Sequence, residues 1–328
     1  MQTRIFGRTG VPVSVVGLGT WQLGADWGDV ADSEALAVLD AAVDSGVTLF
    51  DTADVYGDGR SERTIGAYRA AHPDAPVFVA TKIGRRLEQV PSNYVLENFR
   101  AWTDRSRTNL GVDTLDLVQL HCPPTPVYSD DAVYDALDTL VAEGAIAHYG
   151  VSVERTEEAL AAIARPNVAS VQIILNAFRL KPLDEVLPAA QEAGVGVLAR
   201  VPLASGLLSG RYTTETTFAP DDHRAYNRDG SAFDVGETFS GVDFATGVEA
   251  AQEFSWLAEG HGLSPAAAAL AWILERDGVT AAIPGARSVE QARANASAAD
   301  AVPLGPAFTE AVTALYDTYF RPTLHARW

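Results

Sequence analysis

Eight short apolar segments rich in valine, isoleucine and leucine recur along this chain, and longer stretches with helical spacing separate them. This alternation is typical of repeated strand-helix units. Eight buried strands favour a closed parallel barrel, because an open doubly wound sheet usually has fewer. The chain has 328 residues, and a barrel of this kind takes about 250 before insertions are added. The sequence therefore predicts the α/β class and a single (β/α)8 TIM barrel domain over residues 1–328.

The periodicity also places the individual elements. The expected strands are 14–19, 47–52, 77–82, 115–121, 146–152, 170–175, 195–202 and 279–284. The expected helices are 33–45, 61–71, 92–110, 130–143, 156–163, 183–193, 264–276 and 288–298, several of them beginning after a Ser or Asp that can cap the helix.

Two regions exceed the simple repeat, an insertion over about 203–245 after the seventh strand and a tail over about 300–328. Long connections in a compact domain are more often functional than accidental, and barrel active sites form at the carboxyl ends of the strands. Aromatic residues in these regions either line a pocket or anchor the loop: Tyr212, Phe218, Tyr226, Phe233, Phe239, Phe244 and Trp328.

Composition excludes several classes of function. The formal net charge is −19, so the surface should repel nucleic acid and anionic membranes, which bind proteins through cations. No apolar run reaches the roughly 20 residues needed to cross a bilayer, and the first residues lack the apolar stretch of a secretory signal. The single cysteine, Cys122, cannot form an intramolecular disulfide, and no metal site is evident. We expect a cytoplasmic enzyme with a small-molecule substrate.

Four polar residues stand at or just beyond the ends of three successive predicted strands. Asp51 and Tyr56 follow the second strand, Lys82 ends the third and His121 ends the fourth. These positions converge at one mouth of a barrel. The lysine is notable because the chain has only one other, Lys181, and otherwise uses arginine.

This set of side chains suits carbonyl reduction, which needs a proton donor at the oxygen. A phenol with a pKa near 10 is a weak acid at neutral pH, but Lys82 beside Tyr56 is expected to lower its pKa. Asp51 would hold the ammonium charged, and His121 would donate a hydrogen bond to the developing alkoxide. Taken singly, Asp51, Tyr56 and His121 are more often structural than catalytic. Lys82 is the strongest single indication of a catalytic site, because a lysine that ends an apolar strand faces a buried mouth where its charge needs a partner. Together they predict a catalytic tetrad.

At these residues the sequence resembles the aldo-keto reductase family, over nearly the whole chain. The stretch Phe50-Asp51-Thr52-Ala53-Asp54-Val55-Tyr56-Gly57 is very specific to that family, and its Asp, Tyr, Lys and His tetrad matches the four residues above. Gly7-Arg8-Thr9-Gly10 resembles the family's N-terminal hairpin, which implies a cap at the barrel bottom. One departure is Cys122, which stands between His121 and Pro123 where relatives place Asn, Arg or Trp.

The resemblance implies NADPH bound across the barrel mouth, without a separate dinucleotide domain. Consistent with this, Gly17-x-Gly19 lacks the third glycine of the dinucleotide fingerprint, since residue 22 is Gln. The implied cofactor contacts are Thr20, Trp21, Asp51, Ser152, Gln172, Arg200, Pro202, Leu203, Ser205, Gly206, Leu207, Arg211, Pro284, Gly285, Arg287, Gln291 and Asn295.

Three positions qualify this cofactor interpretation. Val153 replaces an Asn that helps Ser152 and Gln172 to hold the carboxamide, and Asn176 is a candidate substitute. Arg200 stands where many relatives stack an aromatic ring on the nicotinamide, and its planar guanidinium can stack as well. Arg287, with Ser288 at a helix start, suits a 2′-phosphate. Gln291 replaces an Arg common in NADP-specific relatives, so use of NADH stays open.

Two other functions remain open at this point. Lys82 could form a Schiff base in a barrel lyase or isomerase. The chain could also be a non-catalytic subunit that senses a nicotinamide nucleotide. The sequence does not name the substrate, which could be an aldehyde, a ketone or a sugar, and it does not give the oligomeric state.

Overall fold

Eight parallel strands form the centre of the molecule, in the computed structural model that describes residues 1–24 and 30–328. They are β3 (Leu18–Gly19), β4 (Leu49–Asp51), β5 (Phe78–Ile83), β6 (Leu115–His121), β7 (Ile146–Ser152), β8 (Val168–Ile174), β9 (Gly196–Arg200) and β10 (Ala281–Ala282). Each pairs with the next in chain order. Gly17 N then donates to Ala282 O (2.8 Å), which joins the two ends of the sheet. The sheet closes, and the predicted (β/α)8 barrel is confirmed.

All eight predicted barrel strands are present, although several are shorter than expected, the first and the last most of all. In the predicted strand 14–19 the Ser14 hydroxyl donates to Val16 O (2.7 Å), and Ser14 N donates to Thr48 Oγ1 (2.8 Å). These side-chain bonds take Ser14 out of the barrel ladder, so the regular strand is limited to Leu18–Gly19, with an isolated bridge from Val16 to Ala282. The predicted strand 279–284 contracts to β10, because Pro284 has no N–H to continue the ladder.

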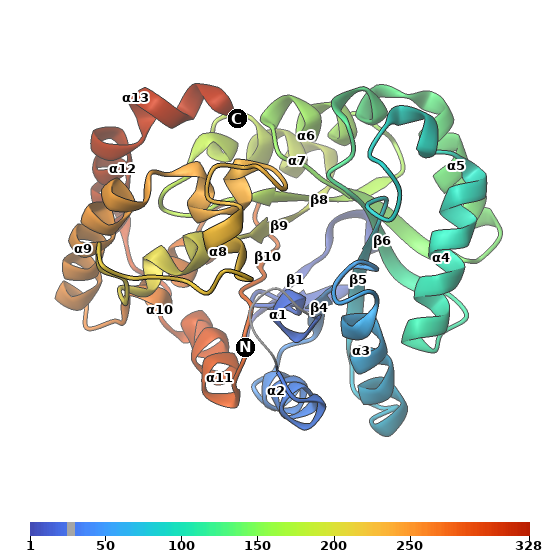
Figure 1. Ribbon diagram of the computed structural model, residues 1–328, viewed down its shortest axis with the longest axis horizontal. Coiled ribbons are helices and arrows are strands. Elements are labelled where there is room, and N and C mark those ends of the chain that lie inside the picture. The colour runs from blue at the N-terminus through green and yellow to red at the C-terminus, as the bar shows by residue number, and fades with distance from the viewer. Residues whose placement is uncertain (25–29) are drawn as a thin grey trace.

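One helix follows each barrel strand and packs outside it, as Figure 1 shows. These helices are α2 (Asp32–Asp44), α3 (Arg60–Ala71), α4 (Leu96–Leu110), α5 (Asp131–Ala142), α6 (Thr156–Ile163), α7 (Val186–Ala193), α10 (Pro265–Leu274) and α11 (Val289–Ser297). Side-chain caps begin three of them, since Asp130, Ser264 and Ser288 each accept a hydrogen bond from a backbone N–H of the first turn. All eight predicted helices are therefore confirmed.

The insertion and the tail contain helices that the sequence interpretation missed. They are α8 (His223–Tyr226), α9 (Phe244–Gly260), α12 (Pro306–Tyr319) and α13 (Arg321–Leu324), and a short α1 (Trp21–Gly24) follows β3. The buried face of α9 is mostly alanine and glycine between Phe244 and Phe254. Small residues give a weak hydrophobic period, which explains why a 17-residue helix was overlooked.

The barrel interior has an apolar layer below and a polar layer above. The apolar cluster comprises Phe6, Val13, Leu49, Phe78, Ala80, Leu117, Ala169, Leu198, Ala281 and Ile283. Side chains two residues apart on a strand face the same way. Asp51, Lys82 and Arg200 therefore point inward, each two residues beyond a member of this cluster. The change from apolar to polar occurs at the carboxyl ends of the strands.

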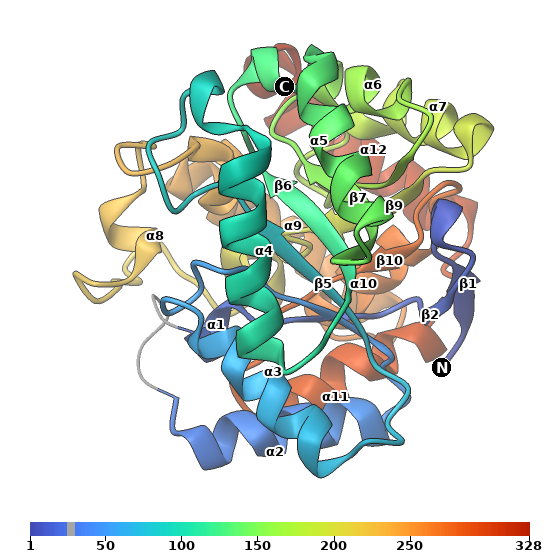
Figure 2. The same cartoon turned by 90° about the vertical axis from the view of Figure 1, so that its right-hand side faces the viewer.

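The β1–β2 hairpin (Thr3–Ile5 and Pro12–Ser14) closes the other end of the barrel, as the sequence predicted. Phe6 is fully buried and its ring meets Phe78 edge to face, with 5.7 Å between centroids. Figure 2 shows the hairpin at one end of the barrel and α8 of the insertion at the other. The upper end is thus the open one. Within the described ranges, every helix is too short or too polar to cross a bilayer.

Candidate active site

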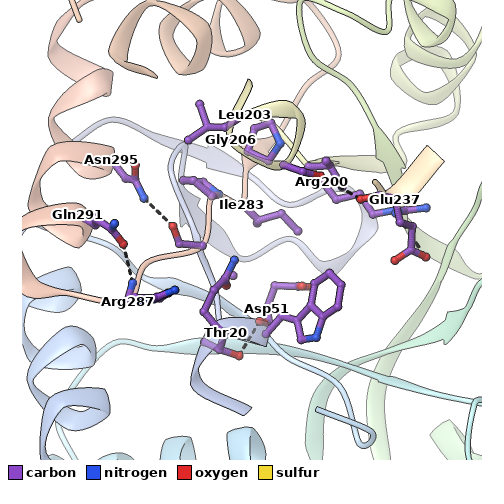
Figure 3. A pocket seen from close by; sticks show the side chains of 18 of the residues that line it. Thr20, Asp51, Arg200, Leu203, Gly206, Glu237, Ile283, Arg287, Gln291 and Asn295 are labelled. Atoms are coloured by element: carbon purple, nitrogen blue, oxygen red, sulfur yellow. Dashed lines mark hydrogen bonds and ion pairs between the residues drawn. The ribbon is translucent and has the colours of Figure 1, made fainter. Parts of the chain in front are cut away.

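A cavity of about 630 Å³ opens at the carboxyl ends of the strands. Residues at the ends of β4, β6, β7 and β9 form its floor, and the insertion and the start of α11 form its walls. Figure 3 shows Arg287, Gln291 and Asn295 at one end, Arg200 and Glu237 at the other, and Asp51 between them. This volume lies in the range of small-molecule and cofactor sites.

Three of the predicted catalytic residues form a connected group at the floor of this cavity. Lys82 Nζ donates to Asp51 Oδ1 (2.6 Å) and to Tyr56 OH (3.3 Å). It also donates to Thr52 O (2.8 Å), so all three ammonium hydrogens have acceptors. Lys82 is 1 % exposed and lies behind Asp51 and Tyr56, which line the cavity. The lysine therefore acts on a ligand only through these two neighbours.

The pKa of Tyr56 differs from the sequence expectation. Burial raises the pKa of the phenol, the charge of Lys82 lowers it, and Asp51 and Glu237 raise it again, so that the pKa lies above its ordinary value. The expected net lowering by Lys82 was wrong, because the sequence shows the charges and not the burial. The phenol stays protonated at neutral pH, which is the form that a proton donor requires.

His121 lines the cavity beside Tyr56, with 5.9 Å between the ring centroids. Burial, together with the charges of Arg85 and Lys82, holds the pKa of His121 well below its ordinary value. The ring is therefore neutral. Its Nδ1 is buried and has no partner among the described residues, which leaves Nε2 for the cavity. The structure thus brings all four predicted tetrad residues together.

The loop that carries Tyr56 is fixed on both sides by arginine side chains. Arg105 of α4 donates to Asp54 O (3.0 Å) and to Asp58 O (2.8 Å). Arg86 donates to the Asp58 carboxylate (2.8 Å). These bonds hold the two residues that flank the short loop, so the Tyr56 hydroxyl is positioned before any ligand arrives.

The predicted cofactor contacts line the same cavity, with one exception. Leu207 is fully buried in the hydrophobic core and does not line it. Its side chain points toward α9, where Gly247 leaves it room, since a Cβ at that glycine would lie 2.8 Å from Leu207 Cδ1. The expectation that Leu207 contacts the cofactor is therefore not supported by its position.

Gln172 has a partner that the sequence did not indicate. Its Nε2 donates to Asp51 Oδ2 (2.7 Å), so the carboxylate of Asp51 is held by Lys82 on one oxygen and by Gln172 on the other. Its amide oxygen is the atom left for a ligand. Asn176 cannot replace the amide missing at Val153, because it is fully buried and its side chain bonds to Val201 O, Ser240 and Phe178 N.

The turn after β9 has an unusual backbone. Val201, Ala204, Ser205 and Gly206 all have positive φ, with values of 52°, 47°, 53° and 98°. Runs of such residues point backbone N–H groups toward one side and can form an anion-binding concavity. Arg211 lies at the same cavity wall. This turn is the candidate site for a pyrophosphate.

The beginning of α11 forms the far end of the cavity. Arg287 N donates to Gln291 Oε1 (2.8 Å), and Asn295 Nδ2 donates to Gly285 O (3.1 Å), as Figure 3 shows. The Ser288 hydroxyl accepts from Gln291 N (3.3 Å). The helix N-terminus and the Arg287 side chain make this end suitable for a phosphate.

A buried cluster of charges beside His121, comprising Arg85, Glu154, Arg200 and Glu237, was missed by the sequence interpretation, which singled out only Arg200. Arg200 Nη2 lies 2.8 Å from Glu154 Oε1, and Arg85 donates to Glu237 Oε1 (3.0 Å). Burial raises the pKa of Glu154 to about 7. Burial also raises the pKa of Glu237, but Arg85 and Arg200 more than offset this and lower it to about 2. We call these four residues the charge cluster.

The charge cluster bears on the proposed stacking role of Arg200. Its guanidinium pairs with Glu154 and donates to Val153 O (3.0 Å), so it is held within the protein even though it lines the cavity. Cys122 lies against it, with 3.7 Å between Sγ and Nη2. Burial raises the pKa of the Cys122 thiol to about 12, so the thiol is neutral.

Other cavity residues also had no motif to reveal them. Gln22, His223 and Arg224 line the cavity. Tyr212 lines it as well, and among the described cavity residues it is the only one of the seven aromatic candidates. Phe239 and Phe244 pack in the core beside Phe218, and Trp328 stacks on Arg179. Most of the aromatic candidates therefore anchor the insertion and the tail.

Comparisons with known proteins agree with this geometry. The sequence profile of the aldo/keto reductase family matches residues 15–317. An uncharacterized oxidoreductase of Mycobacterium tuberculosis is 34% identical over 296 residues, which cover 88% of this chain and 85% of that protein. A glycerol dehydrogenase from Gluconobacter oxydans superposes with a TM-score of 0.77 at 31% identity, covering 97% of this chain and 95% of the other. An aldo-keto reductase from Klebsiella pneumoniae, solved with NADPH, gives a TM-score of 0.71 at 26% identity, covering 99% and 97%.

Proposed function

Because the chain belongs to the aldo/keto reductase family of oxidoreductases, we propose that it reduces the carbonyl of a small organic molecule, with NADPH as the reductant and Tyr56 as the proton donor. The observation that carries this proposal is the position of Lys82, whose ammonium bonds to both Asp51 and the Tyr56 hydroxyl. A protonated phenol beside a buried cation, at the floor of a cavity, is suited to protonate a developing alkoxide.

The roles of the four residues follow from their contacts. The reduced nicotinamide, when bound, supplies a hydride to the carbonyl carbon. Tyr56 OH gives its proton to the carbonyl oxygen as negative charge develops there, and His121 Nε2 donates a hydrogen bond to the same oxygen. The phenolate that remains is stabilised by Lys82, which Asp51 keeps charged and in place.

The residues of the cavity fit a nicotinamide dinucleotide. Ser152 and the free oxygen of Gln172 lie beside Asp51 at the catalytic end, where they can hold a carboxamide. The positive-φ turn from Val201 to Gly206 can hold the pyrophosphate. At Gly285 a Cβ would lie 2.1 Å from Gln22 Oε1, so the glycine makes room for the Gln22 amide at the cavity wall. Gln22 Oε1 is buried without a partner among the described residues, which leaves an acceptor for a ligand.

The direct test is to follow NADPH oxidation with a panel of aldehydes, ketones and sugars, with NADH in parallel. We expect turnover with at least one carbonyl, and faster turnover with NADPH. A protein that binds NADPH but reduces none of them would instead be a nucleotide sensor. Absence of binding by both cofactors would refute the proposal.

The Schiff-base alternative is disfavoured by the state of Lys82. Burial lowers the pKa of its ammonium, but Asp51 and Tyr56 more than offset this and raise the pKa above its ordinary value. A lysine that attacks a carbonyl must be a neutral amine. Borohydride treatment in the presence of a carbonyl substrate should therefore trap no adduct on Lys82.

Arg287 is the residue expected to recognise the 2′-phosphate of NADPH. Replacing it with alanine should raise the Kd for NADPH by at least about tenfold, since a hydrogen bond to a charged group is lost. The Kd for NADH should change little. Arg293→Ala is the matched control, because Arg293 is exposed on the same helix and does not line the cavity. Equal weakening of both cofactors, measured by fluorescence titration, would reject this role for Arg287.

A further inference from the structure

The catalytic end of the cavity contains a carboxylate that the proposed chemistry does not use. Glu237 lines the cavity next to Cys122 and belongs to the charge cluster. Its side chain is 9 % exposed, so ligand atoms at this end would meet a largely desolvated charge. A carboxylate can only accept hydrogen bonds. A ligand group placed against it is therefore favoured when it is a hydrogen-bond donor.

Glu237 is held in place from several sides. Arg85 binds Oε1 (3.0 Å), and the same guanidinium donates through Nε to His121 O (3.1 Å), which links Glu237 to the catalytic histidine. Its backbone carbonyl accepts from Ser205 Oγ (3.1 Å), and its backbone N donates to Asp234 O (3.1 Å). The acceptor is thus preorganised before a ligand binds.

The Glu237 carboxylate has more acceptor positions than its neighbours fill, because an ionised carboxylate can accept about four hydrogen bonds. Arg85 donates to Oε1, and the Glu154 carboxyl gives one further hydrogen bond to the Glu237 side chain. Glu154 is the neighbouring carboxyl of the charge cluster, but both its oxygens are buried and it does not line the cavity. Glu237 is therefore the carboxylate of the charge cluster that lines the cavity and that a ligand can reach.

Carboxyl groups already engage the arginines on this side of the cavity. Arg200 pairs with Glu154 (2.8 Å), and Arg224 donates through Nε to Asp222 (2.8 Å). A substrate carboxylate would find no unpaired cation among these residues and would meet the Glu237 charge. A hydroxyl on the carbon beside the carbonyl would instead donate to the Glu237 carboxylate. The two substituents should therefore have opposite effects.

We propose that Glu237 is a specificity-determining residue that selects carbonyl substrates with a neighbouring hydroxyl group and disfavours those with a neighbouring carboxylate. This inference rests on the proposed reductase function and names its substrate class as small hydroxylated carbonyl compounds. Glu237 also raises the pKa of Tyr56, which affects all substrates alike, so the selective effect is measured as a ratio between substrates that differ only in the substituent.

The test uses three aldehydes with the same two-carbon frame: acetaldehyde, glycolaldehyde and glyoxylate. They carry hydrogen, hydroxyl and carboxylate, respectively, at the same position. The variant Glu237→Gln keeps the size of the side chain and an acceptor for Arg85 but removes the charge. Each substrate is compared between variant and parent, so that differences in hydration among the aldehydes cancel. Glu249→Gln, an exposed change on α9, is the matched control.

Relative to acetaldehyde, Glu237→Gln should lower kcat/KM for glycolaldehyde by about tenfold, because a charged hydrogen bond becomes a neutral one, and should raise it for glyoxylate by a similar factor. Glu249→Gln should change none of the three ratios. If Glu237→Gln alters all three substrates by one common factor, the residue acts only through the fold or through Tyr56, and the inference is overturned. If the parent protein oxidises NADPH with no aldehyde or other carbonyl, the proposed function itself fails, and the inference with it.

Discussion

Replacing Tyr56 with phenylalanine should remove nearly all carbonyl reduction and leave NADPH binding intact. The phenol is the proton donor, and a positioned general acid contributes about 100- to 10,000-fold to the rate. The ring itself should stay in place, because it stacks on Trp21 with 5.9 Å between centroids and 17° between planes. kcat with a carbonyl substrate and the Kd for NADPH, measured by tryptophan fluorescence, separate the two effects.

Two further measurements make this prediction specific. Tyr319→Phe, which removes a hydroxyl that bonds to Glu253 at the surface, should keep full activity. Because the pKa of Tyr56 is raised, the phenol of the parent enzyme stays protonated at neutral pH. The rate of carbonyl reduction should therefore fall only above pH about 10, where the phenol loses its proton. Full activity of Tyr56→Phe would show that another group donates the proton.

The barrel and the tetrad could be predicted from the sequence because both depend on short-range patterns. Apolar runs with regular spacing determine the strands, and a polar residue at the end of such a run must lie at the barrel mouth. Asp51, Lys82 and His121 meet this condition. Tyr56 follows from its short distance along the chain to Asp51. These four side chains lie together in the structure.

The charge cluster could not be predicted in the same way. Arg85 and Glu237 are 152 positions apart, and the insertion that carries Glu237 has no regular period. Its path depends on particular backbone conformations, such as the positive φ of Phe239 and Ser240, which no glycine or proline indicates. The raised pKa of Tyr56 was missed for a related reason, since burial is a property of the folded chain. Long-range pairing and desolvation are what the sequence alone does not reveal.

Replacing Lys82 with methionine should reduce activity to a similar extent as Tyr56→Phe and should also destabilise the protein. Methionine fills much of the same space but removes the cation that stabilises the phenolate. It also leaves Asp51, which is 4 % exposed, without its ion-pair partner. Breaking a buried ion pair from one side costs about 3–5 kcal/mol. Lys181→Met, at the only other lysine, controls for the loss of one positive charge.

The double variant Asp51→Asn with Lys82→Met separates stability from catalysis. Asparagine removes the unpaired charge while its side chain can still bond to Gln172, so the free energy of unfolding should recover part of the loss seen with Lys82→Met alone. Activity should not recover, because the phenolate at Tyr56 still lacks its cation. Denaturant unfolding and kcat are measured on both variants. If stability and activity recovered together, the low activity of Lys82→Met would be a consequence of misfolding, and a direct electrostatic effect of Lys82 on Tyr56 would be refuted.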